Sequence, residues 1–313
     1  MIDPTGSVRA AWRAVRRAKR LVILVALVDG LACLPAAIYA GLAVHRSAAH
    51  QTDATALART FDPDFMADLR GTDGDFDATL IALTASTLVL FFFVRPLFMG
   101  GYVAIAARGD RIRFDEFIRV GGAVYWKFLR IALIGVVTAY LLSLAASPLL
   151  DYIDDQAANF RTEGPALTYR RITELVVFAA FWVLGTILDY TRVGIRMHRR
   201  PGVFAELLRS AVFVMQHPVD TLGFSALAFG IEIAVIWAFA LLLQAADGAY
   251  LITSVAILIL VQVLVALREA CRLFHHAGAW RIRRREEGGG EAEAGRADGL
   301  ARDDLLANLP WNG

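Results

Sequence analysis

The stretch that decides the fold is LVVFAAFWVLGTIL (175–188), followed at once by DYTRVGIRMHRRPGVFAELLRS (189–210). The first part has no charged residue, and the second holds five arginines and one histidine. An apolar run of about 20 residues crosses a bilayer as a helix, and basic residues gather at the cytoplasmic ends of such helices. The stretch therefore predicts a membrane-spanning helix that ends at a basic cytoplasmic surface.

The composition of the whole chain agrees with this interpretation. Of its 313 residues, 57% are hydrophobic and 20% are charged, and the mean hydropathy is +0.52. Soluble domains of this length carry more charge and fewer apolar residues. The two cysteines, Cys33 in an apolar run and Cys271 in a basic segment, predict no disulfide framework.

Six apolar runs have the length of a spanning helix. The predicted spans are 21–44, 79–107, 131–150, 172–191, 221–243 and 251–267. The second contains Arg95-Pro96, and a proline in a helix predicts a kink or a break. The first follows basic residues as a secretion signal does, but its length and Asp29 favour a retained helix.

Lysines and arginines alternate between the two sides of these spans. One side holds 23 of them and the intervening loops hold six; the rich segments are 1–20, 108–130, 192–220 and 268–285. Basic residues are enriched in cytoplasmic loops, so both termini are predicted to be cytoplasmic. The prediction is an all-α membrane protein, with a six-helix domain over 1–285 and a flexible cytoplasmic tail over 286–313.

Three of the basic segments also share a pattern of amphipathic helices that lie in the cytoplasmic interface. SVRAAWRAVRRAKR (7–20), FDEFIRVGGAVYWKFLR (114–130) and VFAELLRSAVFVMQHP (203–218) place apolar residues mainly on one helical face. Each segment precedes a pair of spans, so the pattern predicts a threefold repeat of helical hairpins. The alternative is that flanking amphipathic helices resemble one another by composition alone.

Nine arginines in or beside these segments are candidates for binding lipid headgroups, because the cytoplasmic leaflet is anionic. They are Arg13, Arg16, Arg17, Arg119, Arg192, Arg196, Arg199, Arg200 and Arg209. Setting the topology is the simpler role for such clusters. The tract RIRRR (281–285) is interpreted in the same way, and no nucleic-acid partner is predicted.

Four ionisable residues fall within the predicted spans, namely Asp29, Arg95, Asp189 and Glu232. A charge at membrane depth is costly, so such residues usually face other helices and form pairs. Two interpretations stay open. Either Arg95 forms a polar functional site with Asp29 or Glu232, or the charges form structural ion pairs that fix the helix register.

The sequence carries no signature of a catalytic site. It has no Gly-x-Ser-x-Gly, His-Glu-x-x-His or Cys-x-x-Cys motif and no phosphate-binding glycine loop. Cys271 and His275 lie one turn apart, but two ligands do not make a metal site, and DGDFD (73–77) departs from the calcium-loop pattern. No enzymatic activity, metal or cofactor is therefore predicted.

The segment RPLFMGGYVAIAARGDRIRFDEFIRVGG (95–122) resembles a group of poorly characterised bacterial six-helix membrane proteins. The resemblance rests on the proline, on Gly100-Gly101, on Ala107–Gly109 and on the aromatic and acidic start of an interfacial helix. These proteins are similar to the membrane domain attached to some glycerophosphodiester phosphodiesterases. The resemblance implies an integral protein of the bacterial inner membrane and carries over no catalytic residue, because the 313 residues include no phosphodiesterase domain.

Two functional hypotheses follow. The first is a non-enzymatic accessory or scaffold component of a membrane assembly or a lipid-related process, with membrane lipids and a membrane protein as partners. The alternative is a small transporter or lipid-handling permease whose polar site within the membrane includes Asp29, Arg95 and Glu232.

Overall fold

The computed structural model describes residues 4–48, 76–108, 112–158, 163–198, 202–245 and 251–287. All regular structure in these residues is α-helical, which confirms the predicted all-α class. The helices are α1 (Pro4–Ala48), α4 (Phe76–Arg108), α5 (Phe114–Ala158), α6 (Glu163–Met197), α7 (Val203–Gln216), α8 (Pro218–Ala245) and α9 (Leu251–Glu286). Residues 49–75 of the acidic loop and the tail from 288 lie outside the described residues.

Five of the helices are long and apolar enough to span a membrane, and these are α1, α4, α5, α6 and α8. Their outward faces carry large apolar side chains that are exposed in the isolated chain, among them Leu31, Ile81, Leu175 and Trp237. So much exposed apolar surface is unfavourable in water and favourable against lipid. The chain is therefore a multi-pass membrane protein.

Two of the three predicted interfacial helices are continuous with the spans that follow them. Segment 7–20 is the start of α1 and segment 114–130 is the start of α5, and each helix runs for 45 residues. The third, α7, is separate, because His217 leaves the helical conformation before α8 begins at Pro218. No break occurs at Pro96, since α4 continues through it as one helix.

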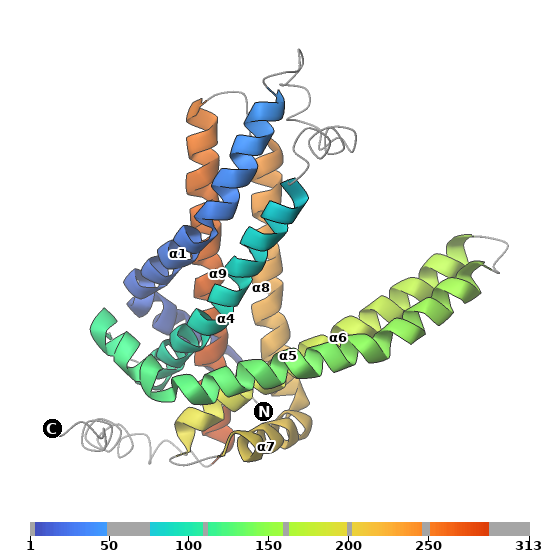
Figure 1. The fold of residues 1–313 in the computed structure, drawn as a ribbon. Helices are drawn as coiled ribbons and strands as arrows, with labels where there is room; N and C mark the ends of the chain where they lie inside the picture. Colours follow the sequence, from blue (N-terminus) through green and yellow to red (C-terminus); the bar gives the residue numbers. More distant parts are fainter. Residues whose placement is uncertain are drawn as a thin grey trace.

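The helices form two parts that meet at one end of the molecule. Helices α1, α4, α8 and α9 form a bundle, and α5 and α6 form a hairpin that leans away from it (Figure 1). The short helix α7 lies across the base of the bundle. The buried apolar core lies at this base and includes side chains from all seven helices, for example Val25, Tyr102, Phe128, Tyr190 and Val214.

The hairpin is joined to the bundle where α4 and α5 cross at glycines. A Cβ atom added to Gly100 on α4 would lie 2.9 Å from the Cα atom of Gly121 on α5. A Cβ atom on Gly121 would overlap the carbonyl oxygen of Leu97, and one on Gly101 would overlap the ring of Phe117. Glycine has no Cβ atom, so it allows two helix backbones to approach this closely. The crossing therefore holds the base of α5 against the part of α4 that carries Arg95.

We predict that Gly121→Ala lowers the free energy of unfolding by about 1–3 kcal/mol, because the new methyl group must displace the backbone of α4. The matched control is Gly122→Ala, since a Cβ atom at this neighbouring residue meets nothing within 4 Å. The control is expected to be neutral or slightly stabilising, because alanine favours a helix over glycine. Thermal unfolding in detergent micelles measures both, and equal stability of the two variants would contradict the close crossing.

Candidate functional site

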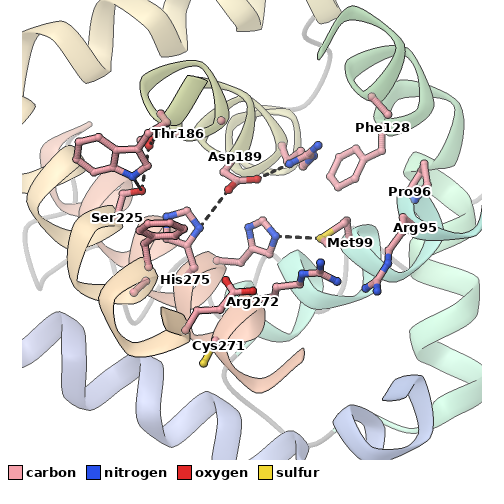
Figure 2. Close-up of a pocket in the computed structure, with 18 of the residues that line it drawn as sticks. Arg95, Pro96, Met99, Phe128, Thr186, Asp189, Ser225, Cys271, Arg272 and His275 are labelled. Atoms are coloured by element: carbon pink, nitrogen blue, oxygen red, sulfur yellow. Dashed lines mark hydrogen bonds and ion pairs between the residues drawn. The ribbon is translucent and has the colours of Figure 1, made fainter. Parts of the chain in front are cut away.

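A cavity of about 560 Å³ lies between the hairpin and the bundle. Its lining comes from α4, α5, α6, α8 and α9, as Figure 2 shows. This volume lies within the range of small-molecule sites, about 300–1,000 Å³. Four of the five contributing helices are candidate membrane spans, so the cavity lies between membrane-embedded segments.

The wall of the cavity combines apolar and charged side chains. The large apolar ones are Leu88, Phe91, Phe92, Phe128, Trp182 and Phe229. The charged and imidazole side chains are Arg95, Asp189, Arg192, Glu232, Arg272, His275 and His276. The cavity is therefore amphipathic, with strongly polar groups beside an extensive aromatic surface.

Arg95 on α4 connects α1 to α9 through two ion pairs. Its Nη2 donates to Asp29 Oδ2 at 2.6 Å, and its Nη1 donates to Glu269 Oε1 at 2.7 Å. The side chains of Asp29 and Glu269 are only 5% and 1% exposed, whereas that of Arg95 is 22% exposed and lines the cavity. The two carboxylates thus lie behind the arginine and hold its guanidinium at the cavity wall.

Glu269 on α9 is the centre of this buried network. Besides Arg95, it accepts a hydrogen bond from Arg272 Nη1 at 2.5 Å and one from the Tyr102 hydroxyl at 2.9 Å. Both of its oxygens are thereby satisfied, as a buried carboxylate requires. Asp29 Oδ1, in contrast, has no hydrogen-bond partner among the described residues. The two arginines balance the two carboxylates, so the network is neutral as a whole.

A second polar cluster ties α6 to α9 at the cavity. Asp189 on α6 forms a hydrogen bond with Arg192 on the next turn, and its Oδ2 lies 3.2 Å from His275 Nδ1 on α9. His276 Nε2 lies 3.1 Å from Met99 Sδ on α4. Figure 2 shows these contacts converging on one region from three helices. The contact between Asp189 and His275 therefore links the hairpin to the bundle by a polar interaction as well as by packing.

The structure places the four predicted intramembrane charges as follows. Arg95 and Asp29 are brought together, whereas Glu232 is bound to Arg268 at 2.7 Å rather than to Arg95. Arg95, Asp189 and Glu232 line the cavity, and Asp29 lies behind its wall. Three of these residues therefore belong to one site and also take part in ion pairs.

Sequence reasoning missed three members of the site, namely Glu269, Arg272 and Tyr102. The arginines of residues 268–285 predict a basic cytoplasmic segment, and that interpretation does not single out the carboxylate of Glu269. The sequence does carry a signal for an ion pair here, because Glu269 lies between Arg268 and Arg272 immediately after an apolar run. An acid and an arginine three residues apart share a helical face and form a pair. No feature of the sequence singled out Tyr102.

The nine arginines predicted to bind headgroups lie in different environments. Exposed side chains belong to Arg13, Arg16, Arg17, Arg119 and Arg209, the last of which also contacts Glu206 at 3.3 Å. Arg192 lines the cavity instead, and Arg196 is half-buried. Arg199 and Arg200 lie outside the described residues.

In the part of the chain that the structure describes, no three His, Cys, Asp or Glu side chains gather as metal ligands. Comparison of this chain with protein-family models, with curated proteins and with solved structures finds no match. What the site can bind therefore follows from the chemistry of its own residues.

Proposed function

We propose that this protein is a lipid-handling permease of the bacterial inner membrane that takes a lipid from the bilayer into the cavity beside Arg95. The observation that carries the proposal is the amphipathic wall of a cavity set between membrane-embedded helices. A soluble polar solute leaves the aromatic surface uncovered, and a purely apolar molecule leaves the charged groups without a polar partner. A molecule with a polar head and an apolar tail satisfies both surfaces.

The proposal includes six spans with both termini in the cytoplasm. The sixth is the start of α9, since residues 251–267 carry no charge and are nearly all apolar. The base of the molecule, with α7 and the basic end of α9, then lies at the cytoplasmic interface. The hairpins α1–α4, α5–α6 and α8–α9 also follow the order of the proposed threefold repeat.

A lipid reaches this cavity sideways, from within the bilayer. Helices α6 and α8 meet at Phe178 and Phe229, whose ring centroids lie 5.6 Å apart, and at Trp182 and Ser225, which form a hydrogen bond. Beyond this level the hairpin diverges from the bundle (Figure 1). In a membrane the space between them holds lipid, so a lipid tail enters without crossing water.

The proposal is tested by a substitution at Gly185 that fills the cavity with a large side chain. This glycine lines the cavity, and a Cβ atom at its position meets nothing within 4 Å, so a large side chain enters without moving the backbone. We predict that Gly185→Trp slows the transfer of fluorescent phospholipid across proteoliposome membranes by about tenfold or more, equivalent to about 1.4 kcal/mol or more.

The matched control is Gly230→Trp on α8. Gly230 is also exposed with no atom within 4 Å of an added Cβ, but it does not line the cavity. The control should transfer lipid at the wild-type rate. Equal rates for the two variants, with both folded, would contradict a permease that uses this cavity.

An accessory component of a membrane assembly is the second candidate, and α7 favours it. Phe204, Leu208, Val212 and Met215 form an exposed apolar stripe along this short helix, outside the candidate spans. Native mass spectrometry of the protein released from its own membrane separates the two candidates. A stoichiometric protein partner supports the accessory role, and a retained lipid without a partner supports the permease.

A further inference from the structure

The charged wall of the cavity points to one class of lipid. We propose that Arg272 and Arg192 bind the phosphate oxyanion of an anionic phospholipid headgroup, with the lipid tails against the aromatic wall. This inference rests on the proposed function, because it names the lipid that the same cavity takes.

Both arginines face the cavity with N–H groups that donate no hydrogen bond to the described residues. A guanidinium has five N–H donors. Among the described residues, Arg272 donates one hydrogen bond, to Glu269, and Arg192 donates one, to Asp189. Their side chains are 24% and 19% exposed, and both line the cavity. The remaining donors form the planar fork that binds a phosphate through two hydrogen bonds.

The two arginines act on the same part of the cavity, at His276. Arg192 is hydrogen-bonded to Asp189, whose Oδ2 lies 3.2 Å from Nδ1 of His275, the residue before His276. Arg272 lies one helical turn before His276 on α9, and His276 is only 2% exposed. Its Nδ1 has no hydrogen-bond partner among the described residues. A buried polar atom without a partner is costly, and a headgroup with phosphate oxygens or hydroxyl groups supplies one. Figure 2 shows the Arg272 guanidinium reaching toward Arg95, which adds a third cation on this side.

The charges that a ligand meets favour an anion. Three arginines and two carboxylates, Asp189 and Glu232, line the cavity, and Glu232 is paired with Arg268 outside the lining. The carboxylates that neutralise Arg95 and Arg272 lie behind the wall, away from the ligand. The cations that a ligand touches are therefore guanidinium groups with unused N–H donors, and a phosphodiester oxyanion accepts hydrogen bonds from them. A zwitterionic headgroup brings an ammonium group toward the arginines and is disfavoured.

The phosphate is that of a lipid rather than a free ion because of the aromatic side chains in the same cavity. Phe91, Phe92 and Phe229 line the same cavity and give it an extensive apolar surface. Inorganic phosphate shares the oxyanion chemistry but leaves this surface uncovered. A phospholipid therefore gains the burial of its tail in addition to the bonds of its headgroup.

The two native cysteines provide a reporter and an internal control. Cys271 lines the cavity next to Arg272, and Cys33 is exposed on α1 outside it. The full chain in uncharged detergent micelles is alkylated with N-ethylmaleimide, and mass spectrometry gives the rate at each cysteine. Phosphatidylglycerol is expected to slow the reaction of Cys271 by about tenfold, the equivalent of one charge-assisted hydrogen bond. Phosphatidylcholine and inorganic phosphate should have much smaller effects, and the Cys33 rate should stay unchanged.

Variants at the two arginines test the headgroup contact. Arg272→Lys and Arg192→Lys should lose most of the protection by phosphatidylglycerol, each measured against its own rate without lipid. Arg272→Lys keeps the charge beside Glu269, so it preserves the buried network while removing the fork. The matched control is Arg113→Gln, an exposed arginine outside the cavity, and it should be protected as the wild type is.

The outcomes distinguish this inference from the proposed function. Equal protection by phosphatidylglycerol and phosphatidylcholine overturns the preference for an anionic headgroup and leaves the permease standing. Protection by inorganic phosphate as strong as that by phosphatidylglycerol overturns the lipid as the source of the phosphate. Failure of both lipids to protect Cys271 overturns the inference and counts against the permease as well.

Discussion

Replacing Arg283 with methionine is expected to lower the free energy of unfolding by about 3–5 kcal/mol, because it leaves a buried carboxylate without its main counter-charge. Arg283 on α9 is fully buried, and its Nη2 donates to Glu206 Oε1 on α7 at 2.5 Å. Its Nη1 donates to the Tyr190 carbonyl oxygen at 2.6 Å and to Ser210 Oγ at 3.0 Å. One side chain therefore holds α6, α7 and α9 together at the base of the molecule.

The remaining partners of Glu206 cannot replace Arg283. Arg209 contacts Glu206 at 3.3 Å but is largely exposed, and pairs of this kind contribute little. His198 Nδ1 lies 3.1 Å from the same carboxylate, at the half-exposed edge of the cluster. The space is also tightly filled, because a Cβ atom on Gly194 would overlap both Glu206 and Arg283.

Two variants make this prediction specific. Arg281→Met removes an exposed arginine from the same helix, and its effect on stability should stay within about 0.5 kcal/mol. Glu206→Gln combined with Arg283→Met removes both charges and should recover much of the lost stability. Chemical or thermal unfolding in micelles measures all three. A loss for Arg283→Met no larger than that for Arg281→Met would show that the buried pair does not hold the base together.

Replacing Arg95 with glutamine is also expected to lower the free energy of unfolding by about 3–5 kcal/mol. The same variant is expected to lose lipid transfer. Glu269 keeps Arg272 and Tyr102 as partners, but Asp29 loses the only cation to which the structure bonds it among the described residues. An unpaired carboxylate between spanning helices is strongly unfavourable. The bundle should therefore loosen where α1, α4 and α9 meet.

The charge-matched double variant separates structure from function at this site. Arg95→Gln with Asp29→Asn removes one charge of each sign, so most of the stability should return. Lipid transfer should stay low, because the cavity has lost a cation that faces its interior. A double variant as unstable as Arg95→Gln alone would contradict the pairing of Arg95 with Asp29. One that regains full transfer would assign Arg95 a purely structural role.

Hydropathy along the chain was sufficient to locate the five helices that are long and apolar enough to span a membrane. A spanning helix must place about 20 successive residues in lipid, so its signal is local and appears in the sequence itself. The boundary between α7 and α8 has a local cause, since His217 precedes Pro218 and a residue before proline is disfavoured in a helix. No proline separates segments 7–20 and 114–130 from their spans, and there the helices are continuous.

The orientation of α7 about its axis was not readable. Its pattern predicts that the apolar residues, among them Phe204, Leu208 and Val214, lie mainly on one helical face. In the structure Val214 is buried beside the polar residues Glu206 and Ser210, whereas Phe204 and Leu208 point outward. In a protein surrounded by lipid, both the interior and the exterior favour apolar side chains, so hydrophobicity does not tell one face from the other.

The sequence by itself determined that this chain is an all-helical, multi-pass membrane protein, because insertion into lipid depends on the composition of each segment. Only the tertiary structure decided which charges meet. Arg95 and Asp29 are 66 residues apart in the chain, and Arg283 and Glu206 are 77 residues apart. Such pairs depend on how distant helices pack and cross, as at Gly100 and Gly121, and no local periodicity encodes that packing.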